Sequence, residues 1–232
     1  MYLLDEEDIA FPPGELANDI GVLAIGGDLS PKRLLHAYAQ GIFPWYNEDL
    51  EPIVWWCPDP RFVLFPNDLK VSKSMRPYFN QKKFTVTYDT VFEEVMRHCM
   101  QASRKGQQGS SWINEDMIEA YTRLNQLGFA HSVEVWQRDE LVGGLYGIAM
   151  GKVFFGESMF TKVSNASKFG FISLVRKLAQ EDYWLIDCQQ QTKHLGSLGA
   201  KAIPRTDFLA LLKKNIEVTG TFSGHTWANY SS

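Results

Sequence analysis

The sequence predicts an α+β fold, in which helices cover a mixed sheet and a small irregular domain precedes it. Turn-forming residues crowd the start of the chain, strand and helix patterns alternate from Arg61 onward, and three successive strand patterns are joined by very short turns. We therefore expect a small N-terminal domain over residues 1–62 and a larger domain over 63–232. A chain of 232 residues is long enough to bury a sizeable core in this arrangement.

The first part of the chain contains one clear helix between its turns. Turn signals occur at FPP (11–13), GG (26–27), FPW (43–45) and CPDP (57–60). Ser30 is a preferred N-cap and Pro31 suits the first helical position, so a helix is predicted over 32–40, and Gly41 ends it.

The second part alternates between the two periodicities. Apolar residues in 61–65 and 83–88 predict strands, and helical spacing in 90–103 and 114–127 predicts helices. Strand patterns over 130–138, 141–149 and 153–160 are separated by the turns RDE and MGK, which predicts an antiparallel meander. An amphipathic helix is predicted over 165–180.

The stretch YWLIDCQ (183–189) begins as a buried strand and then introduces polar residues. After the helix, this strand must run parallel to the strand before it, which is the core order of the GCN5-related acyltransferase fold. Parallel strands splay at their C-terminal ends, so Asp187 and Gln189 are expected to face a cleft there. Strand alternation would place both on one side and Cys188 on the opposite face as packing.

Charge and cysteine content narrow the class of protein. A net charge of -4 excludes a generally basic nucleic-acid protein, but residues 61–83 carry a local basic stretch. The three cysteines have no CxxC spacing, and neither a secretory signal nor an apolar run of membrane length is visible. We expect a cytoplasmic protein without a metal or another cofactor, and a monomer is the default.

Two further features indicate ligand binding. Glu157 interrupts an apolar strand pattern: such a residue usually faces solvent, but it is also suited to hold a ligand's amine or hydroxyl groups in an apolar pocket. Trp45, Trp112 and Tyr121 lie outside the regular apolar faces. Each alone is a candidate core residue, but as a set with Trp55 and Trp56 they resemble a platform on which nucleic-acid bases stack.

Several long blocks are similar to the leucyl/phenylalanyl-tRNA protein transferase family. They are GVLAIGGDLSPKRLLHAYAQGIFPW (21–45), WWCPDPR (55–61), HSVEVW (131–136), ELVGGLYGIAMGKVFFGESMF (140–160), SNASK (164–168) and LIDCQ (185–189). The blocks keep their order over almost the entire chain, so the resemblance is specific.

The resemblance implies a bacterial N-end rule enzyme that moves Leu or Phe, with Met as a further candidate, from tRNA onto proteins that begin with Arg or Lys. It implies the catalytic pair Asp187 and Gln189. The residues that match the family's site for the aminoacyl-adenosine end are Trp45, Trp112, Tyr121 and Glu157. Those that match its apolar side-chain pocket are Leu145, Phe154, Phe171, Leu178 and Ile186. Those that match its basic tRNA-binding cluster are Lys73, Arg76, Lys82 and Lys83.

An aminoacyl ester is already activated, so no ATP is needed. We expect Gln189 to orient the attacking amine through its carbonyl oxygen and Asp187 to supply negative charge, since a carboxamide is a very weak base. One alternative is an acetyl-CoA-dependent N-acetyltransferase, which the missing glycine-rich connection at 161–170 disfavours. The other is a non-catalytic RNA-binding module, which leaves Asp187, Gln189 and Glu157 without a role.

Overall fold

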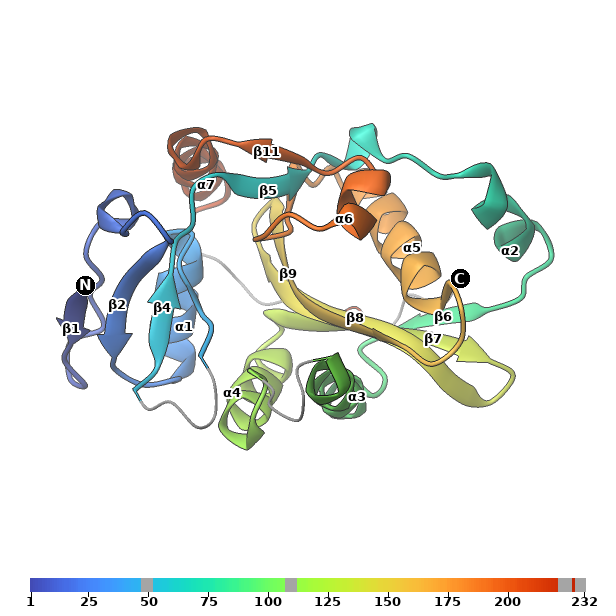
Figure 1. The fold of residues 1–232 in the computed structure, drawn as a ribbon, viewed down its shortest axis with the longest axis horizontal. Coiled ribbons are helices and arrows are strands. Elements are labelled where there is room, and N and C mark those ends of the chain that lie inside the picture. Colours follow the sequence, from blue (N-terminus) through green and yellow to red (C-terminus); the bar gives the residue numbers. More distant parts are fainter. Residues whose placement is uncertain (47–51, 107–111, 221–226, 228–232) are drawn as a thin grey trace.

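The structure is a computed structural model, and it describes residues 1–46, 52–106, 112–220 and 227. Its larger sheet has seven strands in the order β11-β5-β10-β9-β8-β7-β6 (Figure 1). These are β5 (Arg61–Leu64), β6 (Thr85–Tyr88), β7 (Ala130–Gln137), β8 (Glu140–Met150), β9 (Val153–Thr161), β10 (Leu185–Asp187) and β11 (Lys201–Ile203). Strands β7, β8 and β9 form an antiparallel meander, and β10 runs parallel to β9. The α+β fold with a mixed sheet is confirmed.

Helices cover both faces of this sheet. Helix α5 (Ala166–Gln180) lies on one face, and α3 (Phe92–Gly106) and α4 (Glu115–Gln126) lie on the other (Figure 1). Because successive strand residues point to opposite faces, Phe154 packs in the core under α5 while Phe155 packs in the core with α3 and α4. The predicted helices and strands of this part are therefore present.

The first part of the chain is more regular than the sequence predicted. It forms a four-stranded sheet of order β1-β2-β4-β3, built from β1 (Tyr2–Leu4), β2 (Val22–Gly26), β3 (Phe43–Pro44) and β4 (Val54–Trp56). These strands have two to five residues each, too short for a periodic pattern to show. Helix α1 (Pro31–Ala39) is present as predicted, and the Ser30 Oγ accepts a hydrogen bond from the Arg33 N–H at 3.3 Å.

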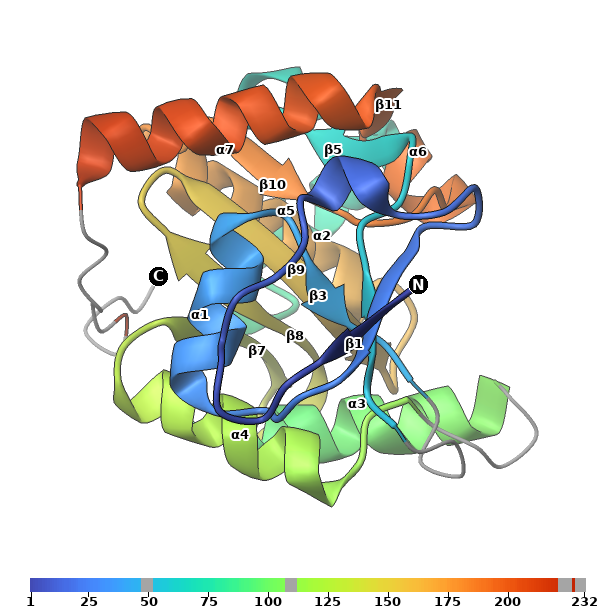
Figure 2. The same cartoon turned by 90° about the vertical axis from the view of Figure 1, so that its left-hand side faces the viewer.

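The first part and the end of the chain share a core. Helix α7 (Arg205–Thr219) lies beside α1 (Figure 2), and Phe208 of α7 is buried in the same cluster as Leu34 of α1 and Val95 of α3. Two short α-helices, α2 (Arg76–Asn80) and α6 (Lys193–Ser197), are also present among the described residues. Sequence reasoning made no prediction for α2, α6, α7 or β11.

The pairing of β9 with β10 determines where the sheet opens. The pair ends at Asp187 opposite Phe155, whereas β9 continues to Thr161. Beyond that point the chain after β10 turns back toward β5, where the Cys188 N–H donates to the Phe62 carbonyl at 2.8 Å. The sheet therefore opens at the C-terminal end of the parallel pair, where the sequence predicted a cleft.

Candidate active site

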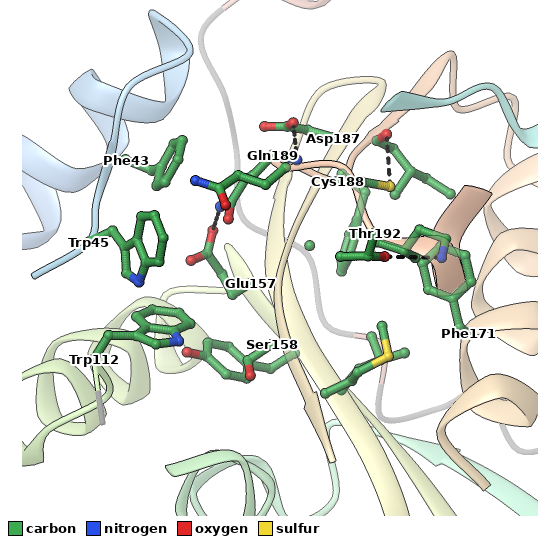
Figure 3. Close-up of a pocket in the computed structure, with 18 of the residues that line it drawn as sticks. Phe43, Trp45, Trp112, Glu157, Ser158, Phe171, Asp187, Cys188, Gln189 and Thr192 are labelled. Carbon is green, nitrogen blue, oxygen red and sulfur yellow. Dashed lines mark hydrogen bonds between the residues drawn. The ribbon is translucent and has the colours of Figure 1, made fainter. Parts of the chain in front are cut away.

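A pocket of about 350 Å³ lies at this opening (Figure 3). One side comes from the continuing part of β9 and the other from the segment after β10. Its lining residues are Phe43, Pro44, Trp45, Trp112, Leu145, Tyr146, Phe154, Gly156, Glu157, Ser158, Met159, Phe171, Ile186, Asp187, Cys188, Gln189, Gln190, Thr192 and Leu195. An apolar interior thus meets a small group of polar side chains, which is the usual composition of a small-ligand site.

Glu157 is the central carboxylate of the pocket. It is 9% exposed, so it does not face bulk solvent. Its Oε1 accepts hydrogen bonds from the Tyr38 hydroxyl at 2.8 Å and from the Gln189 Nε2 at 3.0 Å, while its buried Oε2 has no hydrogen-bond partner among the described residues. Burial raises the pKa of Glu157 to about 8, against the lowering effect of the Tyr38 hydrogen bond. One carboxylate oxygen is therefore left for a ligand's N–H or O–H group.

Asp187 is a fully buried carboxylate held by an arginine. Arg61 Nε and Nη2 donate to its two oxygens at 2.8 and 2.6 Å, a bidentate ion pair. Burial alone would lower the pKa of Arg61, but the charge and hydrogen bonds of Asp187, together with smaller contributions from Cys57 and Glu157, raise that pKa overall. The rings of Phe43 and Phe208 lie 4.8 and 4.6 Å from the guanidinium carbon. The sequence predicts that Asp187 supplies negative charge to the reaction. In the structure Arg61 balances that charge, so Asp187 is not a free negative charge beside the pocket.

Gln189 is placed by a turn and not by the strand. β10 ends at Asp187, and Gln189 has a φ of 58°, so the strand alternation expected for residues 187–189 is absent. Asp187 stabilises this turn, because its Oδ1 accepts the Gln189 N–H at 2.9 Å. The Gln189 side chain then reaches toward Glu157 (Figure 3).

The same turn places Cys188 only partly as predicted. Cys188 is half-buried and packs against the core cluster that contains Ile186 and Leu195, as predicted, but it also lines the pocket, which the strand pattern did not predict. The physical reason is that the backbone leaves the extended conformation one residue earlier than the strand pattern suggests.

The predicted aromatic residues divide into two groups. Trp45 and Trp112 line the pocket near Glu157 (Figure 3). Tyr121 is fully buried behind it, and its hydroxyl forms a short hydrogen bond with that of Tyr38. Burial raises the pKa of both tyrosines well above 10, so they remain neutral hydroxyls. Tyr121 therefore contacts the pocket lining from behind, through Tyr38 and Glu157 and through the ring of Tyr146.

The apolar interior contains most of the residues that the sequence placed there. Leu145, Phe154, Phe171 and Ile186 line the pocket. Leu178 does not line it: it is fully buried in the core between α5 and the sheet.

The four predicted basic residues lie away from the pocket lining. Lys73, Arg76, Lys82 and Lys83 are exposed on the segment that contains α2 and leads into β6. We call them the cationic cluster. In Figure 1 this segment lies beyond α5, at the end of the molecule opposite the four-stranded sheet. Lys83 Nζ also lies 5.0 Å from the centre of the Tyr78 ring.

Sequence reasoning missed several residues of the site, and three of them matter most for its geometry. Phe43 lines the pocket, Tyr38 holds Glu157, and Arg61 holds Asp187. Arg61 carried the only usable signal, because it is a charged residue at the start of an apolar strand run. Tyr38 reads as an ordinary apolar position of an amphipathic helix.

Neither a membrane-spanning helix nor a metal-binding group emerges from the described residues. None of their helices is long and apolar enough to cross a bilayer. Within the same residues, no cluster of three or more His, Cys, Asp or Glu side chains is arranged to hold a metal ion.

Comparison with protein families gives one family in two parts. Residues 63–213 match the sequence model described as leucyl/phenylalanyl-tRNA protein transferase, and residues 27–59 match the model of that family's N-terminal domain. Curated relatives with the same description agree over nearly their full length. The chain is 57% identical over 213 residues to one from Flavobacterium johnsoniae, with 92% of this chain and 99% of the relative covered. It is 52% identical over 226 residues to one from Syntrophobacter fumaroxidans, with 97% and 94% covered.

Solved structures offer only distant likenesses. One is described as L-PGS from Bacillus licheniformis, with a TM-score of 0.43 and 10% identity over 90% of this chain and 68% of that one. Another is a GCN5-related N-acetyltransferase from Kribbella flavida, with a TM-score of 0.32 and 11% identity over 77% and 63%. Neither bears on the chemistry of the pocket.

Proposed function

The chain belongs to the leucyl/phenylalanyl-tRNA protein transferase family, and we propose that it transfers Leu, Phe or Met from aminoacyl-tRNA to an N-terminal Arg or Lys of acceptor proteins. The new N-terminal residue marks the acceptor for degradation. We place the enzyme in the cytoplasm, where aminoacyl-tRNA is made, as a monomer with an N-terminal domain over 1–62 and a catalytic domain over 63–232. The ranges of the two matched family models support that division.

The observation that carries the proposal is the composition of the pocket. Leu145, Phe154, Phe171 and Ile186 form an apolar interior suited to a Leu or Phe side chain. Trp45 and Trp112 stand near the polar groups and offer flat surfaces for the terminal adenine. The Oε2 of Glu157, which no described residue engages, would accept a hydrogen bond from the aminoacyl-adenosine end when the carboxyl is ionised. One ligand that is apolar at one end and a nucleoside at the other fits all three.

The geometry also suits peptide transfer at Gln189. Its Nε2 is engaged by Glu157, so its carbonyl oxygen is the group left to accept an N–H from the attacking amine. The amine nitrogen forms the bond to the ester carbonyl carbon, whose π electrons move onto oxygen. Collapse breaks the bond to the ribose oxygen, and the proton lost from nitrogen passes to that oxygen through the 2′-OH. Orientation of the amine supplies much of the rate.

Asp187 would then act through Gln189. It accepts the Gln189 N–H and is held in turn by Arg61, so it fixes the turn from which the side chain reaches the pocket. We also propose that the cationic cluster, Lys73, Arg76, Lys82 and Lys83, contacts the tRNA backbone. Its exposure and its local positive charge, on a chain of net charge -4, support that assignment.

The direct test is transfer of labelled Leu or Phe from charged tRNA to a peptide that begins with Arg. A peptide that begins with Lys is the second acceptor, and peptides that begin with Asp or Met serve as controls. We expect transfer to the Arg and Lys peptides only. Equal transfer to all peptides, or none to the Arg peptide, would refute the proposed acceptor.

Variants of the catalytic pair test the mechanism. Gln189→Ala and Asp187→Asn should each lower single-turnover transfer about 10²-fold or more while leaving aminoacyl-tRNA binding nearly unchanged. Asp187→Asn also leaves the Arg61 charge buried and unpaired, which costs about 3–5 kcal/mol of stability. The double variant Asp187→Asn with Arg61→Met removes that charge and should still be slow. Full activity in the double variant would show that the pair serves folding alone.

A further inference from the structure

A tryptophan near the end of the chain lies in the sheet core next to the pocket wall. Trp227 is 4% exposed and lies outside the residues that the family models match. Its indole ring stacks on the His131 ring, with centroids 4.0 Å apart and planes 12° apart. On Phe154 the corresponding values are 5.8 Å and 22°. The ring is therefore nearly parallel to both neighbours.

Sheet geometry places Trp227 between those two rings. His131 of β7 pairs with Gly147 of β8, and Phe154 of β9 pairs with Ala149 of β8, two residues further on and on the same face. Strands two apart in a sheet are separated by ~9.5 Å, which is the space that an intervening aromatic ring fills. Gly147 makes room for the Phe154 ring: a Cβ at this glycine would lie 2.6 Å from Cζ of Phe154.

Backbone and side-chain contacts fix Trp227 in this place. Its N–H donates to the Asp89 Oδ2 at 3.0 Å, and the same oxygen is 2.8 Å from the His131 Nδ1. The other Asp89 oxygen accepts the Ser132 N–H at 2.9 Å, so the carboxylate bridges β7 and Trp227. The Tyr88 ring meets the indole edge-on at 6.2 Å.

Phe154 has the pocket on one side and Trp227 in the core behind it. It is 1% exposed and lines the pocket with Leu145, Phe171 and Ile186. An aromatic side chain keeps its rotamer in a close-packed interior because its neighbours leave no other space. Without Trp227, the space between His131 and Phe154 would be empty, and Phe154 would relax into it.

We propose that Trp227 is a positioning residue that sets the depth of the donor side-chain pocket, by holding Phe154 forward against the bound side chain. The proposal rests on the proposed function, because it concerns the amino acid that is transferred. A receding Phe154 enlarges the pocket, which favours Phe over Leu. One or two methylenes of difference in an apolar pocket change discrimination by about 10–200-fold, so a moved ring has a measurable effect.

The experiment compares kcat/KM for Phe-tRNA and Leu-tRNA in Trp227→Ala, Trp227→Leu and the parent chain. The ratio of kcat/KM for Phe-tRNA to kcat/KM for Leu-tRNA, measured on one preparation, does not depend on how much of the protein is folded. A loss of stability alone therefore leaves this ratio unchanged. We expect a shift of at least about threefold toward Phe in the Ala variant and a smaller shift in the Leu variant. If the Ala variant yields no active protein, the Leu variant is the test: its ratio of kcat/KM values should shift toward Phe.

Leu124→Ala is the matched control. Leu124 is fully buried on the opposite side of the sheet, in the core with α3 and α4, so its loss should reduce stability without changing the ratio. A ratio for the Trp227 variants that equals the parent value, or moves toward Leu, overturns the inference. A parent chain that transfers neither amino acid instead refutes the proposed function, so the two failures are distinguishable.

Discussion

At the scale of single residues, the site depends on two buried carboxylates in different environments. Asp187 is paired with Arg61 in a bidentate ion pair, whereas Glu157 accepts hydrogen bonds from the neutral Tyr38 and Gln189, and its second oxygen has no hydrogen-bond partner among the residues that the structure describes. Burial raises the pKa of Glu157 to about 8, although the Tyr38 hydrogen bond and the Arg61 charge act against it, so its charge changes close to neutral pH. We therefore propose different roles for the two acids: Asp187 maintains a backbone turn, and Glu157 is the ionisable group that faces the ligand.

This raised pKa makes a prediction about stability. A carboxyl whose pKa is higher in the folded state than in the unfolded state binds its proton more tightly when folded. The stabilisation that Glu157 contributes to the folded state is therefore fully present below about pH 4.5 and is lost as pH rises through about 8. Glu157→Gln removes this loss, so the variant should gain stability relative to the parent between pH 5 and pH 9, on the order of 1–4 kcal/mol. Urea unfolding at both pH values measures it.

Glu119→Gln is the control for this measurement, because Glu119 is an exposed carboxylate whose side chain is 66% accessible. This variant should change the pH dependence of the free energy of unfolding little. A difference between parent and Glu157→Gln that does not grow with pH would contradict the assigned environment of Glu157.

At the scale of elements, helix α4 connects the aromatic platform to the core. It begins directly after Trp112 and Ile113, and its N-cap is Asn114, whose side chain accepts the Met117 N–H at 2.9 Å. The Asn114 Nδ2 also donates to the Tyr46 hydroxyl at 3.2 Å, next to Trp45. The cap therefore joins the two segments that carry the pocket tryptophans.

Loss of that cap should weaken both stability and donor binding. Asn114→Ala should cost about 1–2 kcal/mol in urea unfolding and raise KM for aminoacyl-tRNA more than it lowers kcat, because the proposed site of the chemistry is Gln189 and not the segments that the cap joins. Asn114→Asp keeps the capping oxygen and should recover most of the stability. An Ala variant with unchanged stability and unchanged KM would show that the cap has no such role.

At the scale of the whole molecule, the proposed tRNA contact lies away from the pocket. The cationic cluster stands on the segment with α2, beyond α5 (Figure 1). The pocket opens elsewhere, between β9 and the chain after β10. An aminoacyl-tRNA that reaches both must extend across the molecule, with its 3′ end in the pocket. Binding energy from the cluster and chemistry at the pocket should then be separable.

Neutralising the cluster tests this separation. Replacing Lys73, Arg76, Lys82 and Lys83 with Gln should weaken aminoacyl-tRNA binding and reduce the slope of log K against log salt by up to about 0.7 for each lost phosphate contact. Transfer from an aminoacyl-adenosine, which lacks the tRNA body, should stay the same. The charge-matched comparison replaces four exposed cations elsewhere with Gln: Lys32, Arg138, Lys213 and Lys214. Equal loss with both sets of substitutions would mean that only net charge matters.

The sequence by itself determined the elements whose patterns are long. The meander and the helix after it were predictable because periods of 2 and 3.6 are visible over eight or more residues. The short parallel strand was predictable because an apolar run follows that helix, and the chirality and length of the connection fix the parallel pairing. The resemblance carried by blocks such as WWCPDPR and LIDCQ further identified the family and about half of the residues that line the pocket. The short strands of the first part left no such pattern.

Only the tertiary structure decided which groups meet. Arg61 and Asp187 are 126 positions apart, and Tyr38 and Glu157 are 119 apart, so no local pattern links them. The turn that ends β10 after Asp187 gave Gln189 its direction and brought Cys188 into the pocket, because a backbone that leaves the extended conformation no longer alternates its side chains. Leu178 and Tyr121 lie in a second layer for the same general reason: sequence tells which residues are apolar and buried, but packing decides which of them form the surface of the pocket.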